Sequence, residues 1–180
     1  KAGMEYPSTS ERRIIMSYIS KINLETAGEK EKKVIEDHLA QGYKLSNEKL
    51  TLLHNIEAFK AIEDSSYTLD RELQRLIGKR AGDFFEYAIS EENECLVCST
   101  YFHKLLKDNG IDFDNFEFTQ KEELLIAFGR ALAKDPKAIP DEIYKELKEE
   151  FTEEQIVVIT AMGVLMVANN YFNDILKIEP

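Results

Sequence analysis

Two cysteines, Cys95 and Cys98, are the residues of this sequence whose type and spacing best suit a chemical reaction. They are the only cysteines in the chain and stand three positions apart. On a helix this spacing places both sulfur atoms on one face, about one turn apart, where a slight yielding of the helix start lets a disulfide form. One thiol can then attack a substrate while the other resolves the product.

The position of the pair near the start of a predicted helix favours thiol reactivity. Backbone N–H groups that lack a partner in the first helical turn lower the pKa of a thiol, and the thiolate is the reactive form. A peroxide oxidises such a thiolate to a sulfenic acid, which a neighbouring thiol converts to a disulfide. We therefore expect redox chemistry that needs no cofactor, only an external thiol or dithiol electron donor that reduces the pair again.

Two other interpretations of the cysteine pair remain open. Half of a zinc site has the same spacing, but a zinc site needs four ligands, and the histidines His38, His54 and His103 are not closely spaced. We therefore expect no metal. Two reduced, inert thiols in a hydrophobic core would also fit the pattern, because free cysteine is among the most buried residue types.

The elements that must position the pair are predicted to be helices, which makes the fold class all-α. Apolar residues recur at three- and four-residue steps over 68–90, which predicts one long helix. The same spacing over 95–108 predicts a second helix with both cysteines on its inner face, ending before the stop signal Asn109-Gly110. Thr119 and Glu122 have the spacing of a capping box. Further helices are predicted over 10–20, 30–41, 47–63, 121–134, 141–150 and 153–176.

The last predicted helix is apolar on every side from Ile156 to Ala168. Such a helix must be enclosed by other helices, and in so small a protein this suggests packing between subunits. The run is too short to cross the roughly 30 Å hydrocarbon layer of a bilayer, so we expect a core helix and no membrane partner. Three amides near its end either line a pocket or cap backbone groups: Asn169, Asn170 and Asn173.

Composition indicates one globular, water-soluble protein. The chain has 180 residues, of which 43% are hydrophobic and 32% charged. Because no linker or repeat divides it, we separate only an N-terminal helical extension, residues 1–45, that packs on a core of residues 46–180. The net charge is −11 and no basic cluster occurs, which argues against nucleic acid as a partner. The N-terminal residues include no apolar signal segment, so we expect a cytoplasmic location.

Several segments carry a resemblance to a known family: 53–59, 69–82, 83–90, 94–98, 103–106, 151–156 and 169–174. They resemble the AhpD-like family, also called carboxymuconolactone decarboxylase-like, and its peroxidase-related members. In that family a helix bearing an acidic residue runs into a turn, and Cys-x-x-Cys with a nearby His opens the next helix. The resemblance covers about Leu50 to Pro180, whereas the first forty-odd residues match only loosely.

The resemblance implies an AhpD-like multi-helix bundle that forms homo-oligomers, trimers or hexamers, by burying helices between subunits. It implies the reduction of small hydroperoxides or of disulfides, with a thioredoxin-like or lipoyl-type reductant as electron donor. By the same analogy Cys98 attacks the peroxide and Cys95 resolves it, while an acid or a histidine assists proton movement.

Two positions depart from the family pattern. The family places its relay histidine four residues after the second cysteine, where this chain has Phe102, and His103 follows one residue later. One residue rotates a helical side chain by about 100°, so His103 is turned away from Cys98 unless the helix bulges. The acidic relay residue, usually Glu, corresponds to Asp83, and Glu86 lies one turn further along the same face. His103, Asp83 and Glu86 are therefore candidates for a proton relay.

Each of these candidates also has a purely structural interpretation. His103 fits the solvent edge of its helix, and Asp83 or Glu86 can pair with a basic residue such as Lys79 one turn away. Two further functions stay open as well. Relatives of the same fold decarboxylate or isomerise small lactones without a cysteine pair, and the two cysteines weigh against this. A non-catalytic oligomeric or redox-sensing protein on the same scaffold is supported by Phe102 and Asp83.

Overall fold

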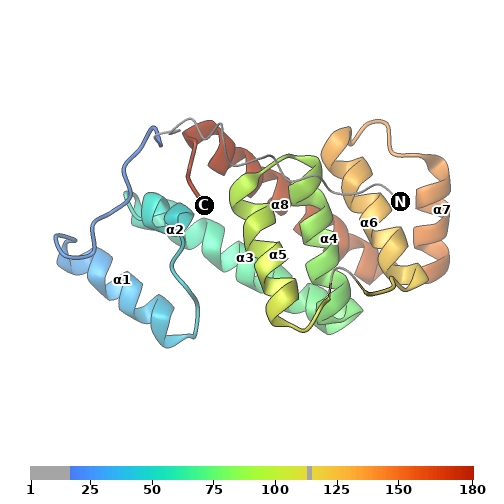
Figure 1. Ribbon diagram of the computed structural model, residues 1–180, viewed down its shortest axis with the longest axis horizontal. Coiled ribbons are helices and arrows are strands. Elements are labelled where there is room, and N and C mark those ends of the chain that lie inside the picture. Colours follow the sequence, from blue (N-terminus) through green and yellow to red (C-terminus); the bar gives the residue numbers. More distant parts are fainter. Residues whose placement is uncertain (1–16, 113–114) are drawn as a thin grey trace.

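The structure is a computed structural model that describes residues 17–112 and 115–180. Figure 1 shows that its regular elements are helices, as the sequence predicts. Eight occur in the described residues: α1 (Glu29–Ala40), α2 (Asn47–Leu52), α3 (Ile56–Ile77), α4 (Lys79–Glu92), α5 (Leu96–Asp108), α6 (Gln120–Lys134), α7 (Asp141–Glu150) and α8 (Glu153–Leu176). The fold is an all-α bundle.

Helix α4 forms the centre of the bundle. Every residue from Ala81 to Ser90 is buried, and α3, α5, α6 and α8 all pack against this helix. Figure 1 shows α4 between α5 and α6, with α8 passing behind and α6 and α7 at one end. The main core includes Phe84, Phe85 and Ile89 from α4 together with aromatic and aliphatic residues of the surrounding helices. Burial of these large side chains is the main favourable term in folding.

A glycine lets α8 approach the central helix closely. A Cβ atom added at Gly163 of α8 would lie only 2.9 Å from the ring of Phe85 and 3.1 Å from the side chain of Leu132. Helix α8 therefore lies against α4 and α6 where a larger residue would force them apart. This contact fixes the position of the asparagines at the end of α8 relative to α4 and α5.

Helices α1 and α2 form a smaller second core with the start of α3, built from Ile35, Leu52, Leu53 and Phe59. Figure 1 shows α1 at the far end of the molecule from α6 and α7. The short helix α2 is tied to the chain end, because Asn47 Nδ2 donates to the carbonyls of Glu179 at 3.0 Å and Pro180 at 3.2 Å. These bonds place α2 beside the C-terminal part of α8.

Two of the predicted helices are wrong in their boundaries. The helix predicted over 47–63 is interrupted after Leu52, and Asn55 begins α3 by accepting a hydrogen bond from the N–H of Ala58 at 2.8 Å. The helix predicted over 68–90 is interrupted at Gly78, whose φ of 91° lies outside the helical region. The apolar spacing runs through both breaks, so periodicity alone could not locate them.

The remaining helix predictions vary in outcome. Those over 30–41, 121–134, 141–150 and 153–176 agree with α1, α6, α7 and α8 to within one residue at each end. The capping box of Thr119 and Glu122 is confirmed. Of the helix predicted over 10–20, residues 10–16 lie outside the described residues, and residues 17–20 are not helical.

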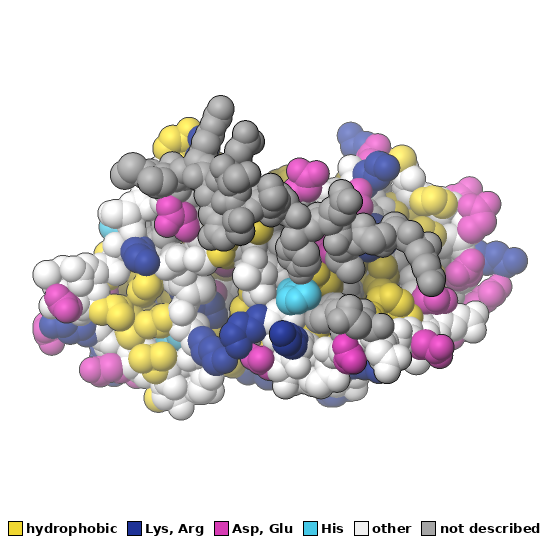
Figure 2. All heavy atoms as spheres, in the orientation of Figure 1, with side chains coloured by type: hydrophobic (Ala, Val, Ile, Leu, Met, Phe, Trp, Pro, Cys, Tyr) yellow, Lys and Arg dark blue, Asp and Glu magenta, His cyan; other side chains and the backbone are white. Residues whose placement is uncertain are grey.

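Helix α8 is buried on one side only within this chain. Ile159, Met162 and Met166 face the core, whereas Val157 and Ile175 on the opposite side are 66% and 69% exposed. Among the described helices, α8 has the length and apolar composition of a membrane span, a test that core helices of soluble proteins also pass. Figure 2 shows acidic side chains gathered over the α6 and α7 end, in line with the net charge of −11.

Gly78→Ala tests the break that separates α3 from α4. No atom lies within 4 Å of an added Cβ, so the expected cost, about 1–3 kcal/mol, comes from the left-handed backbone alone. Gly28→Ala is the control, because Gly28 is also a helix N-cap but has a φ of −68°, and its added Cβ meets only the side chain of Glu31, whose far end can move aside. Urea denaturation should show Gly78→Ala to be the less stable variant by at least about 1 kcal/mol. Equal losses would contradict this account of the break.

Candidate active site

The turn between α4 and α5 places both cysteines at the start of α5. Cys95 is the N-cap residue, and its Sγ accepts a hydrogen bond from the backbone N–H of Cys98 at 3.4 Å. The chain enters this turn through Glu94, whose φ of 56° is left-handed. The N–H of Cys95 then donates to the carbonyl of Ser90 at 3.0 Å, which ties the pair to the buried helix α4. The predicted position of the cysteines at a helix N-terminus is confirmed.

The two thiols are free and in direct contact. Their Sγ atoms are 2.7 Å apart, and neither forms a disulfide. Cys95 is completely buried, whereas Cys98 is 8% exposed. Since a covalent S–S bond is about 2.05 Å long, a small shift brings the two atoms into bonding distance. Cys98 is the more exposed of the two buried residues.

The contact between the sulfurs makes their acidities different. The hydrogen bond from Cys98 lowers the pKa of Cys95, and the backbone N–H of Cys98 adds to this effect against the cost of burial. The same contact, together with burial, raises the pKa of Cys98. When the pair loses one proton, we assign the remaining proton to Cys98, because Cys95 Sγ also accepts the backbone N–H. The first negative charge to form on the pair therefore lies on Cys95.

Asn173 of α8 and Glu48 of α2 complete the surroundings of the sulfurs. Asn173 Nδ2 lies 3.2 Å from Cys98 Sγ and 3.3 Å from Glu48 Oε2. Asn173 is 1% exposed, and burial raises the pKa of Glu48. The negative charges of Asp174 and Glu48 raise the pKa of Cys95, although less than its hydrogen bonds lower it. The carboxylates that act on the sulfurs thus come from α2 and α8.

The two acids that the sequence singled out line a separate cavity of about 210 Å³. Asp83 is buried and forms an ion pair with Lys79 at 2.7 Å, whereas Glu86 Oε1 is buried without a hydrogen-bond partner. Burial raises the pKa of Asp83 and raises that of Glu86 well above the usual carboxyl range. Neither cysteine lines this cavity, whose walls include Asp70, Asp83, Glu86, Tyr101, Phe102 and Met162.

The residues at the relay-histidine position face different surroundings. Phe102, one turn after Cys98, is buried and lines the cavity. His103 is half-buried, and its Nδ1 lies 3.5 Å from the hydroxyl of Tyr87 of α4. Helix α5 is regular over this segment, so the one-residue offset rotates His103 out of the stripe that Cys98 and Phe102 share. The structure brings His103 together with Tyr87.

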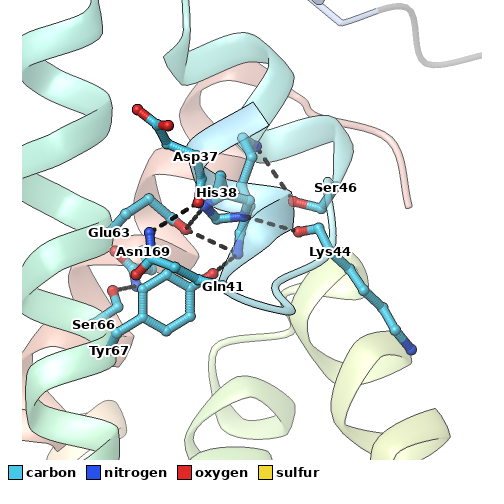
Figure 3. Close-up of polar contacts among 10 residues, drawn as sticks. Asp37, His38, Gln41, Lys44, Ser46, Glu63, Ser66, Tyr67 and Asn169 are labelled. Atoms are coloured by element: carbon cyan, nitrogen blue, oxygen red, sulfur yellow. Dashed lines mark hydrogen bonds and ion pairs between the residues drawn. The ribbon is translucent and has the colours of Figure 1, made fainter. Parts of the chain in front are cut away.

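The other histidines lie apart from the sulfurs. Figure 3 shows His38 of α1 and Glu63 of α3 pointing toward one another, with His38 Nδ1 4.0 Å from Glu63 Oε2 and His38 Nε2 3.3 Å from the carbonyl of Lys44. His54 Nε2 contacts the carbonyl of Ser20 at 2.6 Å. Within residues 17–112 and 115–180 no group of three or more His, Cys, Asp or Glu is arranged to hold a metal ion.

The sequence left Asn173 open between lining a pocket and capping backbone groups, and the structure places its amide against Cys98 Sγ. Glu48 was missed from the sequence, since an acid in the first turn of a helix is ordinary there. What the assembled site can do is thiol chemistry, because two free thiols lie in contact and an amide donor lies beside one of them.

One solved structure has a fold similar to that of this chain. The chain is similar to the crystal structure of an uncharacterized peroxidase-related protein from Silicibacter sp. TM1040, with a TM-score of 0.70 over 99% of this chain and 95% of that chain. The two chains share one fold. Sequence identity is 14%, so the likeness concerns the fold alone. No protein-family model and no curated protein sequence matches the chain.

Glu86→Gln tests the buried carboxyl of the cavity. Because the pKa of Glu86 is raised in the folded protein, its stabilising contribution is present below the usual value of 4.5 and is lost as pH rises through the raised value. The variant should therefore be more stable than the native protein at pH 8, by about 1–3 kcal/mol, and the gain should vanish below pH 4.5.

Thermal unfolding at several pH values measures this effect, and the exposed Glu36→Gln on α1 is the control. The control should shift the unfolding temperature little at any pH. A Glu86→Gln variant that is less stable than the native protein at pH 8 would contradict the protonated, unpartnered carboxyl.

Proposed function

We propose that this chain is a cytoplasmic dithiol oxidoreductase of the AhpD-like type that reduces small hydroperoxides or disulfides through Cys95 and Cys98. The observation that carries the proposal is the 2.7 Å contact between two free thiols at a helix N-terminus. A sulfenic acid formed on one sulfur would meet the other thiol before further oxidation. The shared fold with a peroxidase-related protein supports the same class of chemistry.

Cys98 is the proposed attacking thiol and Cys95 the resolving one. Cys98 is the more exposed of the two residues, and Cys95, whose pKa is lowered, lies in contact with it and can take its proton as it attacks. Cys98 Sγ then bonds to the terminal oxygen of the hydroperoxide, the O–O bond breaks, and the alkoxide is protonated. The resulting sulfenic acid reacts with the thiol of Cys95, forming a disulfide and water.

Two electrons pass from the thiols to the peroxide, and an external dithiol returns them. By resemblance to the AhpD-like family, a thioredoxin-like or lipoyl-type protein is the proposed donor. Asp83, Glu86 and His103 remain proposed proton-handling residues for the leaving oxygen. Glu86 is the strongest of the three, because burial raises its pKa well above the usual carboxyl range and so favours the protonated form that can donate.

A non-catalytic, redox-sensing role is the second candidate. The burial of both sulfurs and the apolar Phe102 at the relay position favour it. A lactone decarboxylase or isomerase role is disfavoured, because relatives with that activity lack a cysteine pair, whereas Cys95 and Cys98 lie in contact in this chain. The two surviving candidates differ in turnover: a sensor is oxidised once, whereas a peroxidase cycles.

Cysteine variants test the enzyme proposal. With a hydroperoxide and a small dithiol, Cys98→Ser should lower peroxide consumption to the rate of the dithiol alone. Cys95→Ser should react once and retain a sulfenic acid on Cys98 that dimedone traps. Thr100→Ala, exposed on the same helix, is the control and should keep full activity.

Two outcomes separate the alternatives. Sulfenic acid trapped on Cys95 in the Cys98→Ser variant would reverse the assignment of attacking and resolving thiols. Native protein that forms the disulfide but shows no turnover would favour the sensor role.

Association through α8 is the proposed basis of a homo-oligomer. Its exposed and half-exposed apolar residues alternate in steps of four and three along one stripe: Val157, Ala161, Val164, Ala168, Tyr171 and Ile175. This spacing is that of a coiled-coil seam, so a second copy of α8 is the occupant that fits it. A trimer or hexamer, as the family resemblance implies, would bury the stripe.

Val164→Glu should break this association, because it places a charge at the centre of the stripe. Analytical ultracentrifugation is expected to show the native protein as an oligomer and the variant as a monomer. Tyr144→Glu, an exposed apolar residue on α7, is the matched control and should leave the mass unchanged. A monomeric native protein would rule the seam out.

A further inference from the structure

The amide group of Asn173 lies between Cys98 and a carboxylate from a distant part of the chain. One nitrogen, Nδ2, contacts both Cys98 Sγ at 3.2 Å and Glu48 Oε2 at 3.3 Å. We propose that Asn173 stabilises negative charge on Cys98 by hydrogen bonding and that Glu48 is the positioning residue that holds this amide in place. The inference rests on the proposed dithiol function. It adds that Glu48, in the N-terminal part of the chain, influences the reactivity of Cys98.

The burial of Asn173 makes its orientation matter. Its side chain is 1% exposed, and Oδ1 is buried without a hydrogen-bond partner. An amide rotated by half a turn would place Oδ1 against both the sulfur and the carboxylate, where acceptor faces acceptor. The carboxylate of Glu48 therefore selects the orientation in which the N–H groups face the sulfur. The unsatisfied Oδ1 is the cost of that orientation.

Glu48 reaches the site because α2 is anchored at its start. Ser46 caps the helix by accepting the N–H of Lys49, and Asn47 bonds to the carbonyls of Glu179 and Pro180 beyond α8. The bonds between Asn47 and Glu179 and between Asn173 and Glu48 each connect residues that are more than a hundred positions apart in sequence. The carboxylate is thereby held beside the last turns of α8, where Asn173 lies.

The amide of Asn173 is useful because negative charge reaches Cys98 only when Cys98 becomes the attacking thiol. In the singly ionised pair the charge forms first on Cys95, and the proton stays on Cys98. When Cys95 takes that proton, the charge moves to Cys98, which has the N–H of Asn173 as a donor. A hydrogen bond to a charged acceptor is roughly twice as strong as one to a neutral acceptor, so the amide favours the attacking form of the pair.

The groups around Glu48 define its pH behaviour. Burial raises the pKa of Glu48, the negative charge of Glu63 raises it further, and the Asn173 amide and Lys49 act in the opposite direction. Glu48 and Asp174 are the carboxylates facing the sulfur pair. As pH falls through the raised pKa of Glu48, its carboxylate becomes protonated and no longer fixes the orientation of the Asn173 amide. The reactivity of Cys98 should therefore decline on the acid side at a pH above the ordinary carboxyl range.

A double-mutant cycle with iodoacetamide as the thiolate probe tests the inference. In the native background Asn173→Leu should slow alkylation of Cys98 at fixed pH by about tenfold to a hundredfold. In a Glu48→Leu background the same substitution should change the rate by less than about threefold, because the amide is no longer held. Glu48→Gln keeps an oxygen acceptor, so it should restore the full effect of Asn173→Leu while removing the acid-side decline.

Glu36→Gln on α1 is the control for loss of a carboxylate and should leave both the rate and the pH profile unchanged. Equal effects of Asn173→Leu with and without Glu48 would overturn the positioning role. Because alkylation does not require hydroperoxide turnover, a cycle with the expected coupling in a protein without peroxidase activity would refute the proposed function and leave this inference standing.

A measurement on the native protein keeps the inference testable if the variants do not fold. The side-chain amide NMR signals of Asn173 should shift with pH in step with the titration of the cysteine pair, and this shift should disappear after methylthiolation of Cys98. Amide signals that do not respond to the cysteine titration would overturn the inference.

Discussion

The proposed chemistry depends on one interaction above others: the 2.7 Å contact between the sulfur atoms of Cys95 and Cys98, two free and buried thiols at the start of α5. An ionised group loses its hydration on burial and needs donors in compensation. For a thiolate on Cys95 the donors are the neighbouring thiol and the backbone N–H of Cys98, and for a thiolate on Cys98 the donors are the neighbouring thiol and the amide of Asn173. Each comes from an element whose position the rest of the fold fixes, so the chemistry of the pair cannot be separated from the packing of the bundle.

That packing begins with α4, the most enclosed of the described helices. Its buried residues fix α5 through the carbonyl of Ser90, which binds the N–H of Cys95. They fix α8 through the ring of Phe85, which lies against Gly163. Two elements that carry donors to the sulfurs are thus held on one rigid helix, while α2 approaches from the other side. The left-handed backbone at Glu94 is the local strain that accompanies this arrangement.

The sequence predicted the parts of this arrangement that follow from local pattern. The cysteine spacing, the helix that begins at the pair and most helix boundaries depend on neighbours a few residues apart, and these predictions were confirmed. The break at Gly78 escaped because apolar residues continue at helical spacing across it, and a glycine within such a pattern does not by itself end a helix. The contact of Glu48 with Asn173 joins α2 to α8 across the tertiary fold, so no local pattern could reveal it. The offset of His103 was read correctly as a rotation off the cysteine stripe, whereas its contact with Tyr87 became visible only in three dimensions.

The proposed function requires the two sulfurs to pass between a reduced form and a disulfide-bonded form. The most direct measurement is a titration of the fully reduced protein with one molar equivalent of an organic hydroperoxide, followed by thiol counting and mass analysis of the peptides. The account predicts that both thiols disappear together, with the loss of two hydrogen atoms and a covalent bond between Cys95 and Cys98 within one chain. Two thiols that stay free, or an oxygen atom added to one sulfur without a bond between the two, would contradict it.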